Sequence, residues 1–503
     1  MNNMRRTQLV KHLTLLAVAV SAVLSPFTSD VRAEKPNIVF VLFDDMGWGQ
    51  PQSYSPNSAL RTPHLDRMVQ QGMRFTDAHS AAAVCTPTRY GVLTGRYPSR
   101  IRQFGVLTTY SPPIIPPTRL TVASLLEQHG YHTACIGKWH LGMNWVDGKP
   151  GNEKQVPIGA RMTDGPNDLG FDYFCGFTHA RNIGTIIEQD RVVAHVEPVE
   201  NQPLMIEKAL KYIDERAEAG GPFFLYFPMC PPHEPVVPAP EYVGQSGAED
   251  IVRNDPRYGD WVYQGDAMLG QILDALERHQ LAEDTLVVAT SDNGAEHRPY
   301  PPLRESKRSI YEGGHRVPFV ARWPGRVKAG CVTHETVCLN DLMATAAEIV
   351  GATLPDDAGE DSVSLLGLLR RGNAESPVRE ATVHQSSAGD LAIRQGPWKQ
   401  IFFRDGRREL YNLESDVSET QDMSADKPEI VEDLTQLMQR YIDRGRSTRG
   451  SDQKNDTNLS LEAKTPKKRT TKKRQGPCHD ATNGRLLVSW PVGSCIPTNG
   501  GGG

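Results

Sequence analysis

Four short apolar runs, each followed at once by polar residues, constrain the fold of this chain more than any other feature. They are Ile38–Phe43 before Asp44-Asp45, Leu286–Thr290 before Asp292-Asn293, "PFFLYFPMC" before His233, and "YHTACIG" before Lys138 and His140. Continuous apolar runs of this kind are typical of strands buried on both faces, as in parallel sheets.

Helical segments separate these runs. The expected helices are Thr62–Gln71, Thr121–His129, Pro203–Ala219 and Tyr258–Arg278. Alternating strands and helices predict an α/β fold with a mainly parallel sheet. Because the carboxyl ends of parallel strands share one edge, the polar residues after the four runs are expected to form a site there.

The pattern changes beyond residue 375. Short expected strands at Ala381–His384, Leu391–Arg394, Lys399–Phe403 and Glu409–Leu413 precede a helix from Pro428 to about Arg444. We therefore predict a catalytic domain over residues 34–375 and a small antiparallel sheet with a helix over 376–446. Residues 447–503 are polar and basic, so we expect a disordered tail. A solvated tail is favoured over one that binds acidic glycans, and Cys478 and Cys495 offer a small disulfide-closed loop.

The first 33 residues have the pattern of a secretory signal peptide. Arg5, Arg6 and Lys11 precede an apolar stretch at 13–24, and Val31-Arg32-Ala33 offers a cleavage site after Ala33. The stretch is short for a membrane span, so an uncleaved anchor is the weaker alternative. We expect an exported protein, periplasmic or extracellular, without a stable membrane anchor.

Charge and cysteine content exclude several classes of function. The 503 residues carry a formal net charge of −5, so no general attraction to nucleic acid is expected. The 8 cysteines include no CxxC pair, which argues against a disulfide framework and against zinc–thiolate sites.

Two strand ends offer oxygen ligands. Adjacent carboxylates at Asp44 and Asp45 repel each other unless a cation lies between them, and Asp292 and Asn293 offer the same chemistry from another strand. One such pair alone is typical of a solvated loop. Two pairs at one sheet edge favour a hard cation, Ca²⁺ with Mg²⁺ as the alternative.

A basic set accompanies these ligands. Its members are Arg89, Lys138, His140, His233 and Lys307. Such residues are commonly ordinary surface groups, but positive side chains beside a bound cation indicate an anionic substrate on which charge develops at oxygen.

The stretch "VCTPTRYGVLTGR" places Cys85 at the expected start of a helix, with Pro87 in its first turn. The helix N-terminus favours an anion there, although a buried apolar thiol is the ordinary interpretation. Thiolate is a poor ligand for Ca²⁺ or Mg²⁺, so cysteine itself fits this site badly.

These motifs resemble those of the sulfatase family. Cys85–Arg89 continued by Leu93–Arg96 resembles the signature C-x-P-[ST]-R…L-T-G-R, with Thr88 where serine is common. Gly137–Gly142, "SDNG" and Glu305–Pro318 resemble later motifs, and the likeness runs from about Lys35 to Arg446. The resemblance implies an alkaline-phosphatase-like core and an arylsulfatase-type hydrolase. It also implies that a formylglycine-generating enzyme converts Cys85 to Cα-formylglycine.

The resemblance also implies roles for individual residues. The metal ligands would be Asp44, Asp45, Asp292, Asn293 and the modified residue 85. One hydroxyl of the hydrated aldehyde would attack sulfur and release the alcohol, and deprotonation of the other would expel sulfate and restore the aldehyde. Arg89 would hold the formylglycine, Lys138 and Lys307 would bind sulfate oxygens, His233 would protonate the leaving oxygen, with Lys307 as a second donor, and His140 would assist deprotonation.

The expected substrate is a sulfated small molecule or glycan, and CTPTRYG resembles the N-acetylgalactosamine sulfatase branch. Phe171–Asn182, with His179 and Arg181 as sugar contacts, and Thr108–Pro117 are expected to line the pocket rim. A phosphodiesterase or phosphonate hydrolase on the same core, and a catalytically silent glycan-binding homologue, are the alternatives.

Overall fold

The computed structural model describes residues 35–247, 255, 257–296, 299–372 and 376–462. The predicted signal peptide, the cluster Lys464–Arg474, and both Cys478 and Cys495 lie outside the described residues.

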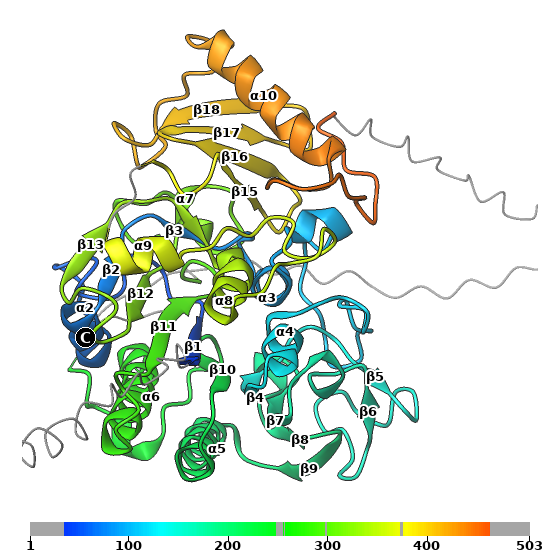
Figure 1. Ribbon diagram of the computed structural model, residues 1–503, viewed down its shortest axis with the longest axis vertical. Coiled ribbons are helices and arrows are strands. Elements are labelled where there is room, and N and C mark those ends of the chain that lie inside the picture. The colour runs from blue at the N-terminus through cyan, green and yellow to red at the C-terminus, as the bar shows by residue number, and fades with distance from the viewer. Residues whose placement is uncertain (1–34, 248–254, 256, 297–298, 373–375, 463–503) are drawn as a thin grey trace, which may run out of the picture. The chain divides into compact units, whose positions relative to one another are not determined.

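A large mixed sheet forms the centre of the molecule (Figure 1). Within the described residues its strand order is β13-β2-β12-β11-β1-β10-β4-β7-β8-β9. The central strands β11, β1, β10, β4 and β7 are parallel, whereas β12, β8 and β9 run antiparallel to their neighbours. This confirms the predicted mainly parallel sheet. The bounds are β1 Asn37–Asp44, β2 Met73–Phe75, β4 His132–Lys138, β7 Tyr173–Phe177, β8 Thr185–Glu188, β9 Arg191–His195, β10 Phe223–Pro232, β11 Thr285–Ser291, β12 Phe319–Arg322 and β13 Cys331–Thr333.

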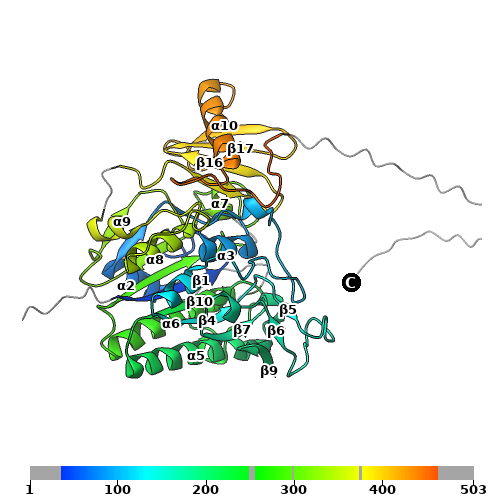
Figure 2. The ribbon, with the colours of Figure 1, turned by 45° about the vertical axis from the view of Figure 1, so that its right-hand side comes forward.

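Strand β1 supplies both faces of the core. Ile38, Phe40 and Leu42 pack into one apolar cluster, and Val39, Val41 and Phe43 pack into another. Figure 2 shows helices α3 and α8 on one side of this strand and α5 and α6 on the other. A strand buried on both faces has no room for polar side chains before its end, which is why the run stays apolar up to Asp44. The helices are α2 Pro63–Gln71, α3 Cys85–Thr94, α4 Val122–Gln128, α5 Pro198–Ala219, α6 Tyr258–Arg278, α7 Glu312–His315, α8 Leu342–Val350 and α9 Leu366–Arg371.

One predicted helix boundary is wrong. Helix α5 begins at Pro198, five residues before the expected start at Pro203. Glu197 and Glu200 form a capping box there, and Pro198 occupies the first turn, where no backbone N–H is needed. Pro203 follows within the helix, where its ring removes one backbone hydrogen bond.

The smaller elements complete the domain. Short strand pairs are β3 Ala78–His79 with β14 Val337–Cys338, and β5 Asn144–Trp145 with β6 Met162–Thr163. Single-turn 3₁₀ helices lie at η1 Pro98–Ile101, η2 Asn167–Leu169, η3 Ala180–Asn182, η4 Pro240–Tyr242 and η5 Leu339–Asp341.

The predicted antiparallel sheet near the C-terminus is present (Figure 1). Its strands pair in the order β15-β16-β17-β18, and helix α10 packs on it through Leu434, Leu437 and Met438. The bounds are β15 Thr382–Gln385, β16 Leu391–Gln395, β17 Trp398–Phe402, β18 Arg408–Asn412 and α10 Pro428–Asp443.

Residues 447–462 correct the expected start of the tail. They fold back on the domain: Asp456 Oδ1 lies 3.0 Å from Arg96 Nη2, and Leu459 and Leu461 pack beside the small sheet. Their polar composition predicted disorder, but their side chains form hydrogen bonds and ion pairs with the buried Arg96 and Arg100.

The described cysteines are all free thiols: Cys85, Cys135, Cys175, Cys230, Cys331 and Cys338. Within the same residues, no helix has the length and apolar character needed to cross a membrane.

Candidate active site

A cleft of about 510 Å³ lies at the carboxyl ends of the parallel strands. Half of the predicted site residues line it: Cys85, Lys138, His140, His233 and Lys307. The other half are fully buried: Asp44, Asp45, Arg89, Asp292 and Asn293. Hydrogen bonds and ion pairs connect these two halves, so the structure brings the whole predicted set together.

The register between β1 and β11 joins the two oxygen-rich strand ends. Phe43 pairs with Ser291 in parallel, so Asp44-Asp45 and Asp292-Asn293 follow at neighbouring strand ends. The backbone N–H of Asp45 donates to Asp292 Oδ1 at 3.1 Å, and Asn293 Nδ2 donates to Asp45 Oδ1 at 2.7 Å. Asp45 has a φ of 71°, a left-handed conformation that turns the chain sharply after the strand.

The donor set fits a hard cation. Asp44 Oδ1 and Asn293 Oδ1 are buried acceptor atoms without a hydrogen-bond partner. Ligand atoms of Asp44, Asp45, Cys85 and His233 all lie within 4.8 Å of one another. Buried oxygen acceptors left unpaired are costly, and a divalent cation satisfies several at once.

Burial and mutual repulsion perturb these carboxyl groups. Burial raises the pKa of Asp45 well above its usual value, with Lys307 opposing and the carboxylates of Asp44 and Asp292 adding to the rise. Burial also raises the pKa of Asp292, to which Asp44 contributes. A bound cation would stabilise the charged carboxylates and so oppose both the burial and the repulsion that raise these pKa values.

Three cationic side chains balance the carboxylates. Lys138 Nζ lies 2.5 Å from Asp44 Oδ2, and Lys307 Nζ lies 2.7 Å from Asp45 Oδ2. Arg89 binds Asp292 through Nε and Nη2, at 3.1 and 2.7 Å. Burial alone would lower the pKa of Lys138, but the acidic groups around it, Asp44 first among them, together outweigh burial and raise this pKa. The lysines are thus held as cations beside the cleft.

Cys85 is the first residue of helix α3 and is only 1% exposed. Burial raises the pKa of its thiol to about 11, with Lys138 and Lys307 opposing the rise. The unmodified side chain is therefore a neutral thiol and a weak nucleophile, in a place where hard oxygen ligands gather.

Hydrogen bonds fix the two histidine tautomers. His140 Nε2 donates to Leu107 O at 3.0 Å, which leaves Nδ1 as a buried acceptor without a hydrogen-bond partner. His233 Nδ1 donates to Glu234 O at 2.5 Å, which leaves Nε2 3.7 Å from Asp45 Oδ2. Each ring thus has one nitrogen free to exchange a proton with a substrate.

Two residues of the site were not singled out from the sequence. Glu296 Oε2 lies 3.2 Å from Lys307 Nζ, and Glu296 Oε1 lies 2.5 Å from Arg308 Nη2. Both residues line the cleft. Their nearness to Asn293 and Lys307 in the sequence was the available signal.

The two predicted rim segments contribute unequally. His179–Asn182 line the cleft, as expected for the segment Phe171–Asn182. Of the segment Thr108–Pro117, only Thr108 lines it. Pro112 instead packs against Gly142. The carbonyl oxygen of Pro112 would lie 2.0 Å from a Cβ atom added at position 142, so only glycine fits there.

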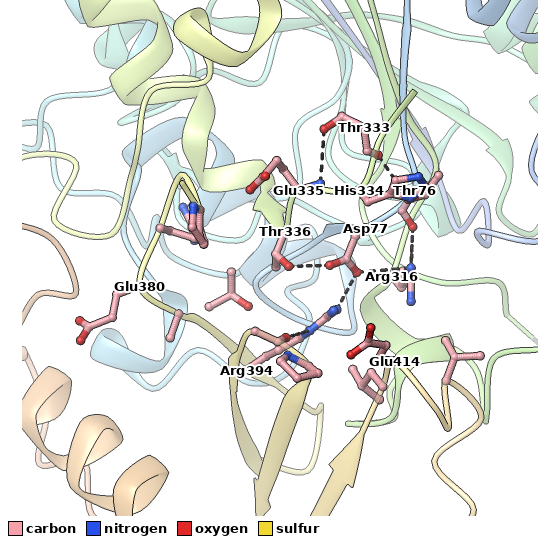
Figure 3. A pocket seen from close by; sticks show the side chains of 18 of the residues that line it. Thr76, Asp77, Arg316, Thr333, His334, Glu335, Thr336, Glu380, Arg394 and Glu414 are labelled. Carbon is pink, nitrogen blue, oxygen red and sulfur yellow. Dashed lines mark hydrogen bonds and ion pairs between the residues drawn. The ribbon is translucent and has the colours of Figure 1, made fainter. Parts of the chain in front are cut away.

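A second cavity, of about 720 Å³, contains none of the predicted site residues. Figure 3 shows Asp77 at its centre, bound to Arg316, Arg394 and Thr336. Asp77 thus pairs with both arginines in this cavity.

A buried histidine group near that cavity is not arranged for a metal ion. The rings of His315 and His384 stack 4.1 Å apart with an interplanar angle of 8°. Lone pairs lie in the ring planes, so stacked rings direct them in parallel rather than toward one ion. His384 Nδ1 also donates to Ser80 O at 3.1 Å.

Paired oxygen ligands, buried lysines and proton-exchanging histidines at this sheet edge define a hydrolase of anionic esters. Residues 36–352 match the model of the Sulfatase family, and residues 304–446 match the model described as N-sulphoglucosamine sulphohydrolase, C-terminal. The chain therefore belongs to the sulfatase family, within the alkaline-phosphatase-like superfamily, and is a sulfuric ester hydrolase.

Individual relatives agree with this assignment. An N-acetylgalactosamine-6-O-sulfatase of Bacteroides thetaiotaomicron is 29% identical over 496 residues, covering 81% of this chain and 93% of that protein. Arylsulfatase A of Homo sapiens is 33% identical over 411 residues, covering 74% of this chain and 76% of that protein. A structure solved in work on glycosaminoglycan metabolism by Bacteroides thetaiotaomicron superposes with a TM-score of 0.72 at 28% identity, covering 81% of this chain and 99% of that one.

Proposed function

We propose that this chain is an exported sulfatase that releases sulfate from glycans and uses a nucleophile made from Cys85. The observation that carries the proposal is the position of Cys85 Sγ, within 4.8 Å of ligand atoms from Asp44, Asp45 and His233. Sulfur is a poor partner for the hard cation that these oxygens fit, whereas the oxygen atoms of a hydrated Cα-formylglycine suit it. Ca²⁺ is the proposed ion, with Mg²⁺ as the alternative.

The formylglycine hydrate supplies a hydroxyl that accepts the sulfuryl group and later releases it as sulfate. The protein's own residues prepare both steps. Lys138 and Lys307, held as cations by Asp44 and Asp45, attract the sulfate oxygens. Arg89 is fixed by Asp292 and by its Nη1 donation to Lys138 O at 2.8 Å, so it supports the turn that carries residue 85.

The histidines move the protons. His233 Nε2 points to the cation-binding carboxylates and lines the cleft, where a bound sulfate ester would favour its protonated form. It can then give this proton to the leaving alcohol oxygen, with Lys307 as the second donor. His140 Nδ1, a buried acceptor, is suited to take the proton from the remaining hydroxyl.

Burial of residue 85 also bears on maturation. Its side chain is 1% exposed, so a formylglycine-generating enzyme would act on the chain before the fold closes around helix α3.

The substrate class is proposed from the relatives. One of the similar proteins is the N-acetylgalactosamine-6-O-sulfatase of Bacteroides thetaiotaomicron. We therefore take N-acetylgalactosamine 6-sulfate as the first candidate substrate. The test is a screen of sulfated mono- and oligosaccharides for sulfate release, with matched phosphate esters and a Cys85→Ala variant. The proposal is supported if the wild type releases sulfate from sulfated sugars and the Cys85→Ala variant does not. It is overturned if the wild type hydrolyses the matched phosphate esters much faster than the sulfate esters.

A further inference from the structure

Arg308 is held in a backbone conformation that suits glycine. Its φ is 81°, and both of its backbone polar groups are engaged. Its N–H donates to Ala83 O at 2.7 Å, and its carbonyl oxygen accepts from the N–H of Ser387 at 3.0 Å. An L-residue is strained in this region, so a side chain retained there points to a role for the side chain itself.

Packing does not explain the arginine. Its side chain is 52% exposed and lines the cleft beside Lys307. Among the described residues, its side chain pairs with Glu296, whose Oε1 lies 2.5 Å from Nη2. A half-exposed ion pair contributes little to stability, so it does not offset the strain.

Glu296 ties this arginine to the reaction centre. Its side chain is 10% exposed, and its second oxygen lies 3.2 Å from Lys307 Nζ. The carboxylate thus bridges the proposed sulfate-binding lysine and the guanidinium. Arg308 therefore lines the same cleft as the proposed sulfate-binding lysine, where the group attached to the scissile sulfate is expected to lie.

An arginine and a carboxylate side by side match the chemistry of a hydroxyl group. A hydroxyl can accept from the guanidinium and donate to the carboxylate, whereas a second sulfate ester can only accept and is repelled by Glu296. We infer that Glu296 and Arg308 are specificity-determining residues that bind one free hydroxyl of the sulfated sugar and exclude a sugar sulfated at that position. This inference rests on the proposed action on glycans.

The test compares substrates within each variant. The probes are N-acetylgalactosamine 6-sulfate, its 3-deoxy and 4-deoxy analogues, and its 3,6- and 4,6-disulfates, with 4-nitrophenyl sulfate as a sugar-free reference. Arg308→Gly removes the side chain and suits the observed φ, Arg308→Lys keeps only the charge, and Glu296→Gln removes only the negative charge. The ratio of kcat/KM between parent and analogue is the readout, because it does not depend on overall activity.

In the wild type, we expect one deoxy analogue to lose about tenfold or more in kcat/KM, since a site built for a hydroxyl rejects its absence. The disulfate at the same position should be excluded as well. Arg308→Gly and Arg308→Lys should bring the deoxy ratio to within about threefold of one. Glu296→Gln should admit the disulfate. The melting temperature of Arg308→Gly should not fall below that of the wild type.

Unchanged ratios in Arg308→Gly would overturn the inference while leaving the proposed function intact. A wild-type preference for a disulfate would also overturn it, because Arg308 would then bind a second anion. Hydrolysis of 4-nitrophenyl sulfate without hydrolysis of any sugar sulfate would instead overturn the proposed action on glycans, and this inference with it.

Discussion

Asp44 offers one carboxylate oxygen to Lys138 and leaves the other without a hydrogen-bond partner. Oδ2 lies 2.5 Å from Lys138 Nζ, whereas Oδ1 is buried and has no hydrogen bond. One carboxyl group therefore both holds a proposed sulfate-binding lysine and remains available to a cation. We therefore expect sulfate binding and cation binding to be coupled through this residue.

Asp44→Asn should weaken cation binding and activity together. The amide keeps the size of the side chain but loses the charge that attracts Ca²⁺ and orients Lys138. We expect Ca²⁺ affinity, measured by calorimetry after chelation, to fall by at least about tenfold, with a parallel loss of sulfate release. The exposed Asp274 of helix α6, which pairs with Arg67 of helix α2, gives the control Asp274→Asn. Equal Ca²⁺ affinity in both variants would contradict the assignment of Asp44 as a ligand.

Replacing His233 should matter most for poor leaving groups. A sugar alkoxide needs a proton as it departs, whereas 4-nitrophenolate does not. His233→Ala should therefore lower kcat on a sugar sulfate by about 100-fold or more, and on 4-nitrophenyl sulfate by less than about tenfold. His132→Gln, at the opposite end of β4 from Lys138, is the matched control. Equal losses on both substrates would argue against His233 as the proton donor.

The sequence was sufficient to predict that the candidate site residues lie together, because polar residues mark the end of each strand. Asp44, Asp292 and Lys138 follow continuous apolar runs, a pattern that predicts strands buried on both faces. Parallel pairing then brings the carboxyl ends of these strands to one edge of the sheet. The proposed role of Arg308 could not be predicted from the sequence, because it rests on a φ of 81° and on a carboxylate 12 positions away. Backbone conformation and side-chain partners of this kind arise only when loops close.

Element boundaries likewise depend on tertiary contacts as well as on local sequence signals. Pro203 is a helix-start signal by local rules, but the capping box at Glu197 and the core contacts of Asn201 and Gln202, both fully buried, extend helix α5 backward. Residues 447–462 read as tail because they are polar. Their order depends on partners such as Arg96 and Arg100 that lie more than 300 residues earlier.

The buried carboxyl group of Glu419 is expected to make the stability of the fold depend on pH. It is fully buried between Lys399, whose Nζ lies 2.8 Å away, and the N–H of Glu312 at 2.6 Å. Burial raises its pKa from 4.5 to about 7, with Lys399 opposing and Glu312 adding to the rise. A carboxyl whose folded pKa is raised contributes stability that is full below about 4.5 and is lost as pH rises through about 7.

Glu419→Gln should remove this loss, because glutamine stays neutral at every pH. The melting temperature of the variant, relative to the wild type, should be higher at pH 8 than at pH 5. Glu414→Gln, on the exposed surface nearby, should shift the melting temperature equally at both values. A relative melting temperature for Glu419→Gln that is lower at pH 8 than at pH 5 would contradict the raised pKa.

The central claim is that Cys85 is the precursor of the nucleophile. Its most direct test is mass spectrometry of the peptide that contains residue 85, taken from protein produced together with a formylglycine-generating enzyme and active in sulfate release. We expect residue 85 to have a lower mass than cysteine, because it loses one sulfur and two hydrogens and gains one oxygen. The fraction of chains with this lower mass should rise and fall with the specific activity. An unmodified thiol at residue 85 in fully active protein would contradict it.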